Sequence, residues 1–591
     1  MQLTDDVHQQ FANYFPSKAL RPYLYSLSQK LNEGHICLDV NQIDLKHLAE
    51  AGYQSVVDKK VIQSDSLISN GNNIAPFVLF NERLYMHRYF NYETIILNRI
   101  KDFVENEQQK KEQRLSTLMA NDTFIKELFK ENNEDYKNVT NWQMAAVITA
   151  LLNNFTIITG GPGTGKTTTV AKILSILFTI NPLLKVALTA PTGKAAARMK
   201  ESLEGADTVS AEMKDKFKSL QPSTIHRLLG YVKNSPHFKA NQGNPLNYDI
   251  IIADESSMID VALFAKLLSA IGPDTRLILL GDKDQLASVE AGSLFGDLCQ
   301  AQTQLNMMST ERVALINSFT DEIGQKIKDN HIAHNTSHPL FEHIIELKFS
   351  RRFKDSEGIG KFSKAIINNK VAEINLFFSN TDKQVFIDTN YAEEIFKDFV
   401  LGYRAFTQEK DIRKALTLIN NLRVLCAIRE GEQGLYAINK KIEKHLEKEK
   451  IIDIDSDFYI NRIIMVTSNN RELNLFNGDI GIIRADDNGI SRAWFQAGED
   501  EIKSVLPGFI SNAETVFAMT IHKSQGSEFD KILVILPKGE DIKILTRELL
   551  YTAVTRAKNK VTIQGSQALI LKTAEAIVQR GSGIIDRFNQ A

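Results

Sequence analysis

One segment of the sequence, GGPGTGKT at residues 160–167, combines the residue types and the spacing that bind phosphate groups. It fits the pattern GxxxxGK[ST], in which glycines let backbone N–H groups turn inward and touch a phosphate without interference from Cβ atoms. Lys166 can reach the β- and γ-phosphates of a nucleotide, and the Thr167 hydroxyl can bind Mg²⁺. A strand-like run precedes the loop and a helical pattern follows it, so the helix N-terminus adds to the attraction for an anion. The residues that we expect to bind ATP here are Gly160, Gly161, Pro162, Gly163, Thr164, Gly165, Lys166, Thr167 and Thr168.

A pair of acidic residues, Asp254 and Glu255, ends the apolar run IIIA. An isolated Asp-Glu pair is most often a solvated strand end. This pair, however, comes after the phosphate-loop strand, with enough intervening chain for a βαβα unit, and that context favours catalysis. Asp254 can then hold Mg²⁺, directly or through water, and Glu255 can orient or deprotonate the water that attacks the nucleotide.

A parallel sheet is the element that can bring these residues together. Short apolar runs alternate with helical patterns, which is typical of parallel strands covered by helices on both faces. The runs lie at residues 155–159, 185–190, 248–254 and 276–282. The same pattern returns at 531–537 and 561–565, so we expect a second sheet-containing unit from about residue 340 onward.

The remaining chain suggests two further parts. Residues 457–512 contain short strand-like runs separated by NN, NG and DNG turns, which predict a small antiparallel barrel inserted in the second unit. Residues 1–110 mix helical patterns with one strand-like segment, and the polar stretch 106–114 is either a solvated helix face or a domain boundary. We therefore expect an α/β protein whose domains span residues 1–110, 111–340 and 341–591.

The composition excludes several classes of protein. The three cysteines (Cys37, Cys299 and Cys426) lie far apart, which excludes a disulfide framework and the usual zinc spacings. The polar N-terminus does not resemble a signal peptide, and no apolar run approaches the ~20 residues of a membrane span, so we expect a soluble intracellular protein. The chain has 70 Lys+Arg and 72 Asp+Glu, so its formal charge is −2. Many nucleic-acid-binding proteins have an excess of basic residues, and the net charge of this chain gives no such indication.

Nine elements in a fixed order resemble the motif set of superfamily 1 DNA helicases. They are Gln143, GGPGTGKTTT (160–169), APTGKAAARM (190–199), STIHRLLG (223–230), DESSMID (254–260), GDKDQLASVEAGSLFGD (281–297), SRRF (350–353), TIHKSQGSEFD (520–530) and YTAVTRAK (551–558). Several motifs are similar in wording to the alpha subunits of exodeoxyribonuclease V, the RecD family. Further segments of that wording are EGHICLDV (33–40), NERLYMHR (81–88), LCAIREGEQG (425–434) and NLFNGDIGI (474–482). The resemblance thus covers essentially the whole chain.

This resemblance implies two RecA-like P-loop domains with parallel sheets, ATP bound between them and single-stranded DNA across their top. A mixed, mainly helical N-terminal domain is implied to dock on a partner subunit. Gln143 is implied to read the adenine edge with its amide, and Gln285 to sense the γ-phosphate. Arg352 and Arg556 are the implied arginines of the second domain, with Arg351 as the alternative to Arg352.

The implied DNA contacts lie in three of the motifs. Residues 191–193 follow a strand and open a helix, which suits a phosphate. The DNA-binding residues are then Pro191, Thr192, Gly193, His226, Thr520, His522 and Lys523. A single histidine more often fills a core or surface role, and only the motif favours DNA for His226. Glu528 is implied either to contact the nucleotide ribose or to link the ATP and DNA sites.

The function that the resemblance implies is ATP-dependent 5′-to-3′ translocation and unwinding of duplex DNA ends, in double-strand-break repair and recombination. The chain would act with beta and gamma subunits in the bacterial cytoplasm, using ATP and Mg²⁺. We find no nuclease module, in agreement with a nuclease that belongs to the beta subunit. The alternatives are a free-standing 5′-to-3′ helicase and a non-catalytic DNA-binding subunit.

Overall fold

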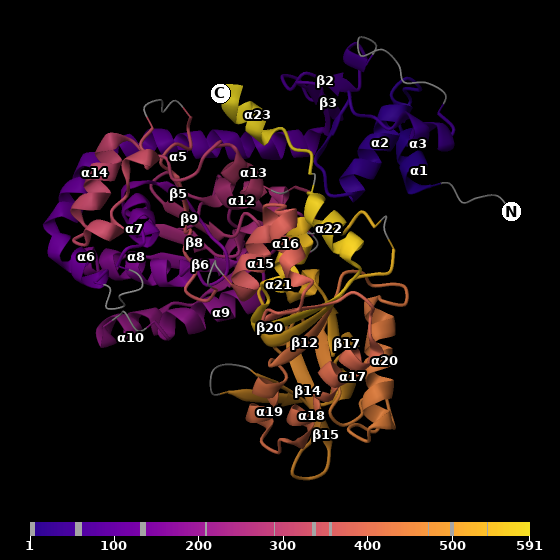
Figure 1. The fold of residues 1–591 in the computed structure, drawn as a ribbon. Coiled ribbons are helices and arrows are strands. Elements are labelled where there is room, and N and C mark those ends of the chain that lie inside the picture. Colours follow the sequence, from indigo (N-terminus) through magenta and orange to yellow (C-terminus); the bar gives the residue numbers. More distant parts are fainter. Residues whose placement is uncertain are drawn as a thin grey trace.

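The computed structural model contains two parallel sheets, one antiparallel sheet and a mixed N-terminal region (Figure 1). The structure describes residues 6–53, 62–130, 137–206, 210–233, 235–288, 290–292, 294–333, 338–353, 357–470, 472–496, 501–539, 542–578 and 580–590. This architecture confirms the predicted α/β class with parallel sheets. No helix in these ranges is both long and apolar enough to cross a membrane.

The N-terminal region packs three helices against a small sheet. Its helices are α1 (Val7–Tyr14), α2 (Arg21–Asn32) and α3 (Leu45–Glu50). Its strands, in the order β1-β4-β3-β2, are β1 (Cys37–Asp39), β4 (Arg83–Met86), β3 (Phe77–Phe80) and β2 (Ile68–Ser69). The sequence predicted a single strand here, because strands of two to four residues are too short to show an alternating pattern.

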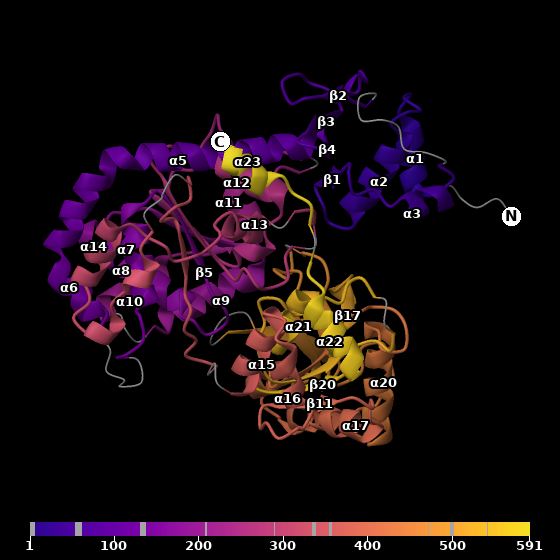
Figure 2. The same ribbon diagram turned by 45° about the horizontal axis from the view of Figure 1, so that its top comes forward.

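Helix α5 (His87–Ala120) runs from this region along the first parallel sheet and is 34 residues long (Figure 2). It contains the whole polar stretch 106–114, and residue 110 lies inside it. The expectation that this stretch is a solvated face is wrong for Glu107 and Arg114, which are both buried. Their burial is possible because Glu107 Oε2 accepts from Asn154 N at 2.8 Å, and Arg114 donates to Leu152 O at 2.6 Å.

The first parallel sheet has the order β10-β5-β9-β8-β6-β7. Its strands are β5 (Phe155–Thr159), β6 (Val186–Ala190), β7 (Ser223–Thr224), β8 (Ile250–Ala253), β9 (Arg276–Gly281) and β10 (Ile344–Glu346). The helices of this part, which we call the first unit, are α6 (Asp122–Leu128), α7 (Trp142–Leu152), α8 (Lys166–Ile180), α9 (Gly193–Glu204), α10 (Ala211–Ser219), α11 (Ile225–Leu229), α12 (Val261–Ala270), α13 (Leu294–Gln300) and α14 (Thr310–Ser318). Since every pair in the sheet is parallel, the carboxyl ends of all its strands share one edge.

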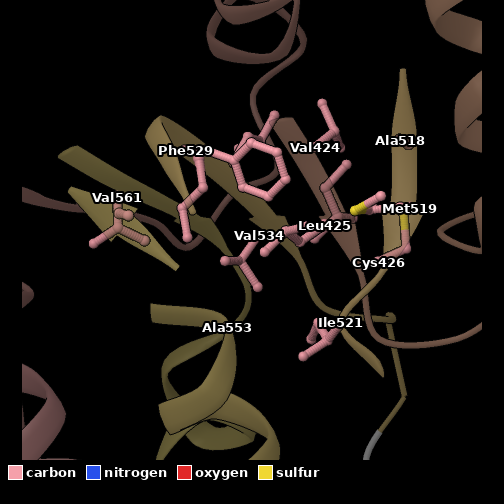
Figure 3. Close-up of a cluster of buried hydrophobic side chains, with 14 of the residues drawn as sticks. Val424, Leu425, Cys426, Ala518, Met519, Ile521, Phe529, Val534, Ala553 and Val561 are labelled. Atoms are coloured by element: carbon pink, nitrogen blue, oxygen red, sulfur yellow. The ribbon is translucent and has the colours of Figure 1, made fainter. Parts of the chain in front are cut away.

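The second parallel sheet has the order β11-β20-β19-β12-β18. Its strands are β11 (Val385–Asp388), β12 (Leu422–Cys426), β18 (Ala518–Thr520), β19 (Phe529–Ile535) and β20 (Ala557–Gln564). The helices of this second unit are α15 (Gly358–Ile367), α16 (Val371–Phe377), α17 (Glu393–Leu401), α18 (Arg404–Gln408), α19 (Ile412–Leu418), α20 (Leu435–Lys448), α21 (Arg547–Val554) and α22 (Gln567–Glu575). Buried side chains such as Leu425, Phe529 and Val534 belong to the same hydrophobic core as Ala553 of α21 (Figure 3).

The antiparallel sheet carries the turn-rich segment as an addition to the second unit. Its order is β16-β15-β14-β13-β17. The strands are β13 (Ile463–Val466), β14 (Ile480–Ala485), β15 (Ser491–Gln496), β16 (Ile502–Val505) and β17 (Ala513–Thr515). Four of them lie within 457–512, and the fifth lies just after it. Ile464, Ile483 and Phe495 belong to its small separate core.

The end of the chain leaves the second unit and returns to α5. Helix α23 (Ile584–Gln590) lies beside α5 in both views (Figures 1 and 2). Gly583 N donates to Glu93 Oε1 at 2.8 Å, and Arg587 forms an ion pair with the same buried carboxylate at 3.1 Å. Nothing in the sequence pattern indicated this return, because it depends on residues from opposite ends of the chain.

Candidate functional site

The phosphate loop connects β5 to α8, as its sequence predicted. Gly163 (φ +77°) and Gly165 (φ +85°) adopt left-handed backbone conformations that favour glycine. Lys166 Nζ donates to Gly160 O at 2.6 Å and to Gly161 O at 3.3 Å, so its ammonium group lies over the loop. This is a position from which it can exchange backbone carbonyls for phosphate oxygens.

Gln143 lies against the same loop, at the start of α7. Its Nε2 donates to Thr164 O at 3.1 Å. It also lines a pocket together with Trp142, Phe349 and Arg351. The aromatic side chains provide flat apolar surface, and the amide provides a donor and an acceptor, which together suit a purine base. Sequence reasoning identified Gln143 and missed Trp142 and Phe349, which carry no motif signal of their own.

The acidic pair lies at the carboxyl end of β8, on the same sheet edge. Asp254 Oδ1 accepts from Glu255 N at 2.8 Å. Burial and the neighbouring charge of Glu255 raise the pKa of Asp254 to about 6, while Lys166 opposes this shift. Glu255 has φ +51°, a left-handed conformation that is costly for a residue with a Cβ and is most often found at functional sites.

A magnesium ion fits this edge only with help from a nucleotide. In the described residues, no three or more His, Cys, Asp or Glu side chains gather as a metal site. Asp254 and the Thr167 hydroxyl are hard oxygen donors, and Mg²⁺ is commonly held by one or two such groups together with phosphates and water. The donor set therefore suits a nucleotide-bound Mg²⁺ rather than a permanently bound metal.

The loop after β9 brings Gln285 to the cleft between the two units. Gln285 Nε2 donates to Asp282 Oδ2 at 3.0 Å, and Tyr551 OH donates to the same oxygen at 3.1 Å from the second unit. Burial raises the pKa of Asp282 to about 6 against the opposing charge of Lys166. Among the described residues, Gln285 Oε1 is buried without a hydrogen-bond partner. This free acceptor is suited to a water molecule near the phosphates.

Two further hydrogen bonds join this loop to the second unit. Leu286 N donates to Thr552 Oγ1 at 2.8 Å, and Gln525 Nε2 donates to Leu286 O at 2.6 Å. These bonds therefore connect the cleft residues of the first unit to those of the second unit, whose sheet is formed by a later part of the chain.

Arg556 and Arg352 approach the cleft from different elements. Arg556 is buried, with Nε donating to Thr552 O at 3.1 Å. Burial lowers the pKa of Arg556, and the carboxylates of Glu255 and Glu528 oppose that shift. Arg352 lies beside Gly163, where a Cβ built on the glycine would be 2.4 Å from Arg352 Cβ. Its guanidinium binds Glu528 at 2.7 Å.

The segment that carries Arg352 extends from the first sheet. Strand β10 pairs with β5 of the first sheet. It begins after residue 340, where the sequence suggested that the first domain ends. Arg351 and Arg352 follow it, with Arg351 N donating to Gly163 O at 2.9 Å. The side chain of Arg351 lines the pocket beside Gln143, whereas Arg352 extends toward Glu528.

Several of the expected DNA-binding residues also converge. Thr192 caps α9 by accepting from Ala195 N at 3.2 Å, which leaves the first N–H groups of the helix for an anion. Lys523 Nζ donates to Asn477 Oδ1 at 3.2 Å, at the tip of the antiparallel sheet. In the same loop, Phe476 lies against Gly193.

The remaining expected contacts are more enclosed. Thr520 is buried, and its Oγ1 accepts from Lys523 N at 3.3 Å. Burial lowers the pKa of His522 and that of His226. The His226 ring lies edge-on to Phe238, with a centroid distance of 5.7 Å. Thr520 and His522 therefore lie with Lys523 in the segment 520–523. His226 lies on a different element, α11, where its ring packs against Phe238.

Two family models and several known proteins match this chain in sequence. The family model described as an AAA domain matches residues 143–291, and the one described as a UvrD-like helicase C-terminal domain matches residues 515–564. The RecBCD enzyme subunit RecD of Haemophilus influenzae is 35% identical over 87% of this chain and 81% of the relative. The RecD subunit of Buchnera aphidicola from Acyrthosiphon pisum is 32% identical over 93% of this chain and 92% of the relative.

Other similar proteins are more distant. The ATP-dependent RecD2 DNA helicase of Deinococcus radiodurans is 25% identical over 75% of this chain and 52% of its own length. A crystal structure of Bacteroides Pif1 bound to single-stranded DNA overlaps 76% of this chain and 96% of that chain, at 16% identity and a TM-score of 0.40. The two RecD subunits match this chain over most of both lengths. The chain therefore belongs to the RecD family of ATP-hydrolysing DNA helicases.

Proposed function

We propose that this chain is the helicase subunit of a RecBCD-type complex, translocating 5′ to 3′ on single-stranded DNA and unwinding duplex ends. The observation that carries the proposal is the meeting of groups from both units in one nucleotide cleft. Tyr551 binds Asp282 across it, and Glu528 binds Arg352. A cleft closed by two units can convert nucleotide binding and release into relative motion of those units.

The roles in ATP hydrolysis follow from the chemistry of each group. Lys166 and the loop N–H groups hold the phosphates, and Gln143 reads the adenine edge. Glu255 orients or deprotonates the attacking water, assisted by Gln285. Arg352 and Arg556 stabilise charge on the γ-phosphate as the bond to the leaving group breaks.

Mg²⁺, held by Asp254 and Thr167, would supply charge neutralisation at the phosphates. Gly160, Gly161, Pro162, Gly163, Thr164, Gly165 and Thr168 complete the nucleotide cradle in this proposal.

The DNA would lie across α9 and the segment 520–523. Thr192 and Gly193 offer backbone N–H donors to one phosphate, and Pro191, which has no N–H, contacts the DNA beside them. Thr520, His522 and Lys523 offer donors from the second unit. His226 would add a contact from α11. Local donors of this kind do not require a basic protein, which fits the formal charge of −2.

Assembly with beta and gamma subunits is the remaining part of the proposal, with nuclease activity supplied by the complex. It is supported by the match to RecD subunits over 93% of this chain, including the N-terminal region. Such a complex would act on broken DNA in the bacterial cytoplasm, in repair and recombination.

We would test these roles with duplexes that carry a single-stranded tail on one end. The full chain should hydrolyse ATP faster with single-stranded DNA, should open 5′-tailed duplexes, and should co-purify with the beta and gamma subunits. Lys166→Ala should lower ATP turnover by about 10²–10³-fold, because it removes the charge nearest the phosphates.

Opening of 3′-tailed duplexes alone would contradict the polarity. Unwinding without any association with the two subunits would favour a free-standing helicase. Nucleotide binding with no turnover would instead indicate a non-catalytic DNA-binding subunit. Normal ATP turnover in Lys166→Ala would show that this lysine does not take part in hydrolysis.

A further inference from the structure

Two ion pairs meet on one carboxylate oxygen between the two units. Arg198 NH2 lies 2.5 Å from Glu528 Oε1, and Arg352 NH1 lies 2.7 Å from the same atom. Arg198 NH1 also donates to Gly526 O at 3.3 Å. Arg198 is on α9 of the first unit, Arg352 follows β10, and Glu528 directly precedes β19 of the second unit. We call these three residues the ionic triad.

The triad carries an excess positive charge beside the ATP site. Burial acts to raise the pKa of Glu528, but Arg198 and Arg352 outweigh it and lower the pKa to about 2. The carboxylate is therefore charged at neutral pH, and two guanidinium groups share it. These two groups repel each other, so Glu528 can release one of them at a lower cost than breaking an isolated buried pair.

Arg352 is the arginine of the triad that a bound nucleotide can attract away from Glu528. It lies next to Gly163 in the phosphate loop, and its side chain is 28% exposed. Arg198 is held at two points, by Glu528 and by Gly526 O. A γ-phosphate in the loop therefore competes with Glu528 for Arg352, while the Arg198–Glu528 pair remains.

The Arg198–Glu528 pair joins two elements that also carry expected DNA contacts. Arg198 lies five residues after Gly193, or roughly 7.5 Å along the rigid α9 helix. Glu528 likewise shares a short segment with Thr520 and Lys523. A stronger Arg198–Glu528 pair therefore holds the two DNA-binding elements more firmly together.

We propose that Arg198 is a positioning residue that couples the ATP site to the DNA site through Glu528. When ATP draws Arg352 to its γ-phosphate, Glu528 binds Arg198 alone, and α9 and the segment 520–528 move together on the DNA. This inference rests on the proposed helicase function and adds the residue that transmits the nucleotide state. Arg198 lies within the motif APTGKAAARM, and no role was expected of it from the sequence.

The test is a measurement of linkage with the full chain. The Kd of a single-stranded oligonucleotide is measured with and without a non-hydrolysable ATP analogue, and the Kd of the analogue with and without the oligonucleotide. The two ratios must be equal, and we expect 5–150-fold coupling in the unaltered chain. Arg198→Ala should reduce both ratios to within about twofold of unity, since the link is lost.

Four variants define the specificity of this effect. Lys200→Ala removes another α9 cation, which pairs with Glu204 on the same helix, and should retain full coupling. Arg198→Lys should recover part of the coupling, because it keeps the charge. Glu528→Gln should lose coupling as Arg198→Ala does, and the double variant should lose no more than either alone. Glu528→Gln also provides the test if Arg198→Ala does not fold.

Other results would overturn the inference. Full coupling in Arg198→Ala would show that the pair transmits nothing. An equal loss of DNA affinity with and without the analogue would make Arg198 a simple DNA contact. Failure of the unaltered chain to bind DNA or to show coupling would instead contradict the proposed function itself.

Discussion

Single residues shape the phosphate site through backbone conformation as well as side-chain chemistry. Gly165 turns the chain into α8 with φ +85°, and a Cβ at this position would lie 2.1 Å from Gln143 Nε2. Glu255 adopts a similar left-handed conformation although it carries a Cβ. The glycine therefore allows a close approach between the loop and the amide proposed to read adenine.

Replacement of Gly165 by alanine should weaken nucleotide binding. A left-handed alanine costs about 1–2 kcal/mol, and the added methyl group must also displace Gln143. We expect the Kd for an ATP analogue to rise by at least about tenfold, measured by titration calorimetry. Gly489→Ala is the matched control, because Gly489 has φ +77° with no atom within 4 Å of an added Cβ. An equal loss of affinity in both variants would refute the role of the Gly165–Gln143 contact.

The long helix α5 shows how one element is held by buried polar groups. Arg114 donates to Leu152 O at 2.6 Å and to Asn154 Oδ1 at 2.6 Å, and Glu107 accepts from Asn154 N. These contacts fix α5 next to the start of β5, whose far end carries the phosphate loop. Charged residues on a helix are usually exposed. The acceptors Leu152 O and Asn154 Oδ1 allow Arg114 to be buried, and the donor Asn154 N does the same for Glu107.

Arg114→Ala should therefore destabilise the protein more than a surface substitution on the same helix. It leaves buried acceptors without a donor, which costs about 1–3 kcal/mol. The free energy of unfolding in urea measures this loss, and Glu112→Ala, at an exposed position of α5, should change it by less than about 0.5 kcal/mol. Equal effects of the two substitutions would show that the Arg114 contacts do not stabilise the helix.

At the scale of the whole molecule, the C-terminal segment joins three parts of the structure. A cavity of about 590 Å³ lies where they meet, and its lining includes His35, Gln285 and Arg547. Beside it, Ser582 Oγ donates to Asp297 Oδ2 on α13 at 2.6 Å. Burial raises the pKa of Asp297 to about 7, against the opposing effect of the Ser582 hydrogen bond. The junction thus contains a carboxyl group that binds a proton more tightly in the folded state than in the unfolded chain.

This shift predicts how stability changes with pH. Because the folded-state pKa is raised, the stabilisation from protonated Asp297 is lost as pH rises toward 7. Asp297→Asn keeps an oxygen acceptor without the charge, so its stability relative to the unaltered chain should grow by roughly 1 kcal/mol between pH 6 and pH 8. Melting temperatures at the two pH values measure this gap. Asp274→Asn is the control, at an exposed site where Lys110 lowers the carboxyl pKa, and its relative stability should not grow over this pH range. If the stability difference between Asp297→Asn and the unaltered chain stayed constant, the raised pKa of Asp297 would be contradicted.

The sequence alone determined the parts that depend on local chemistry. The phosphate loop must contain glycines at strained turns, and buried parallel strands must be short apolar runs, so β5, β6, β8 and β9 were predictable within one or two residues. Motif order led to the family because it records many such local requirements at once.

Only the tertiary structure decided which distant groups meet. Arg198 contacts Glu528, Arg352 separates from Arg351, and the C-terminal segment returns to Glu93. No periodicity encodes these contacts, since each depends on packing between elements far apart in the chain. A buried charge is stable only where folding supplies its partner, and that partner cannot be identified from the residues on either side of it.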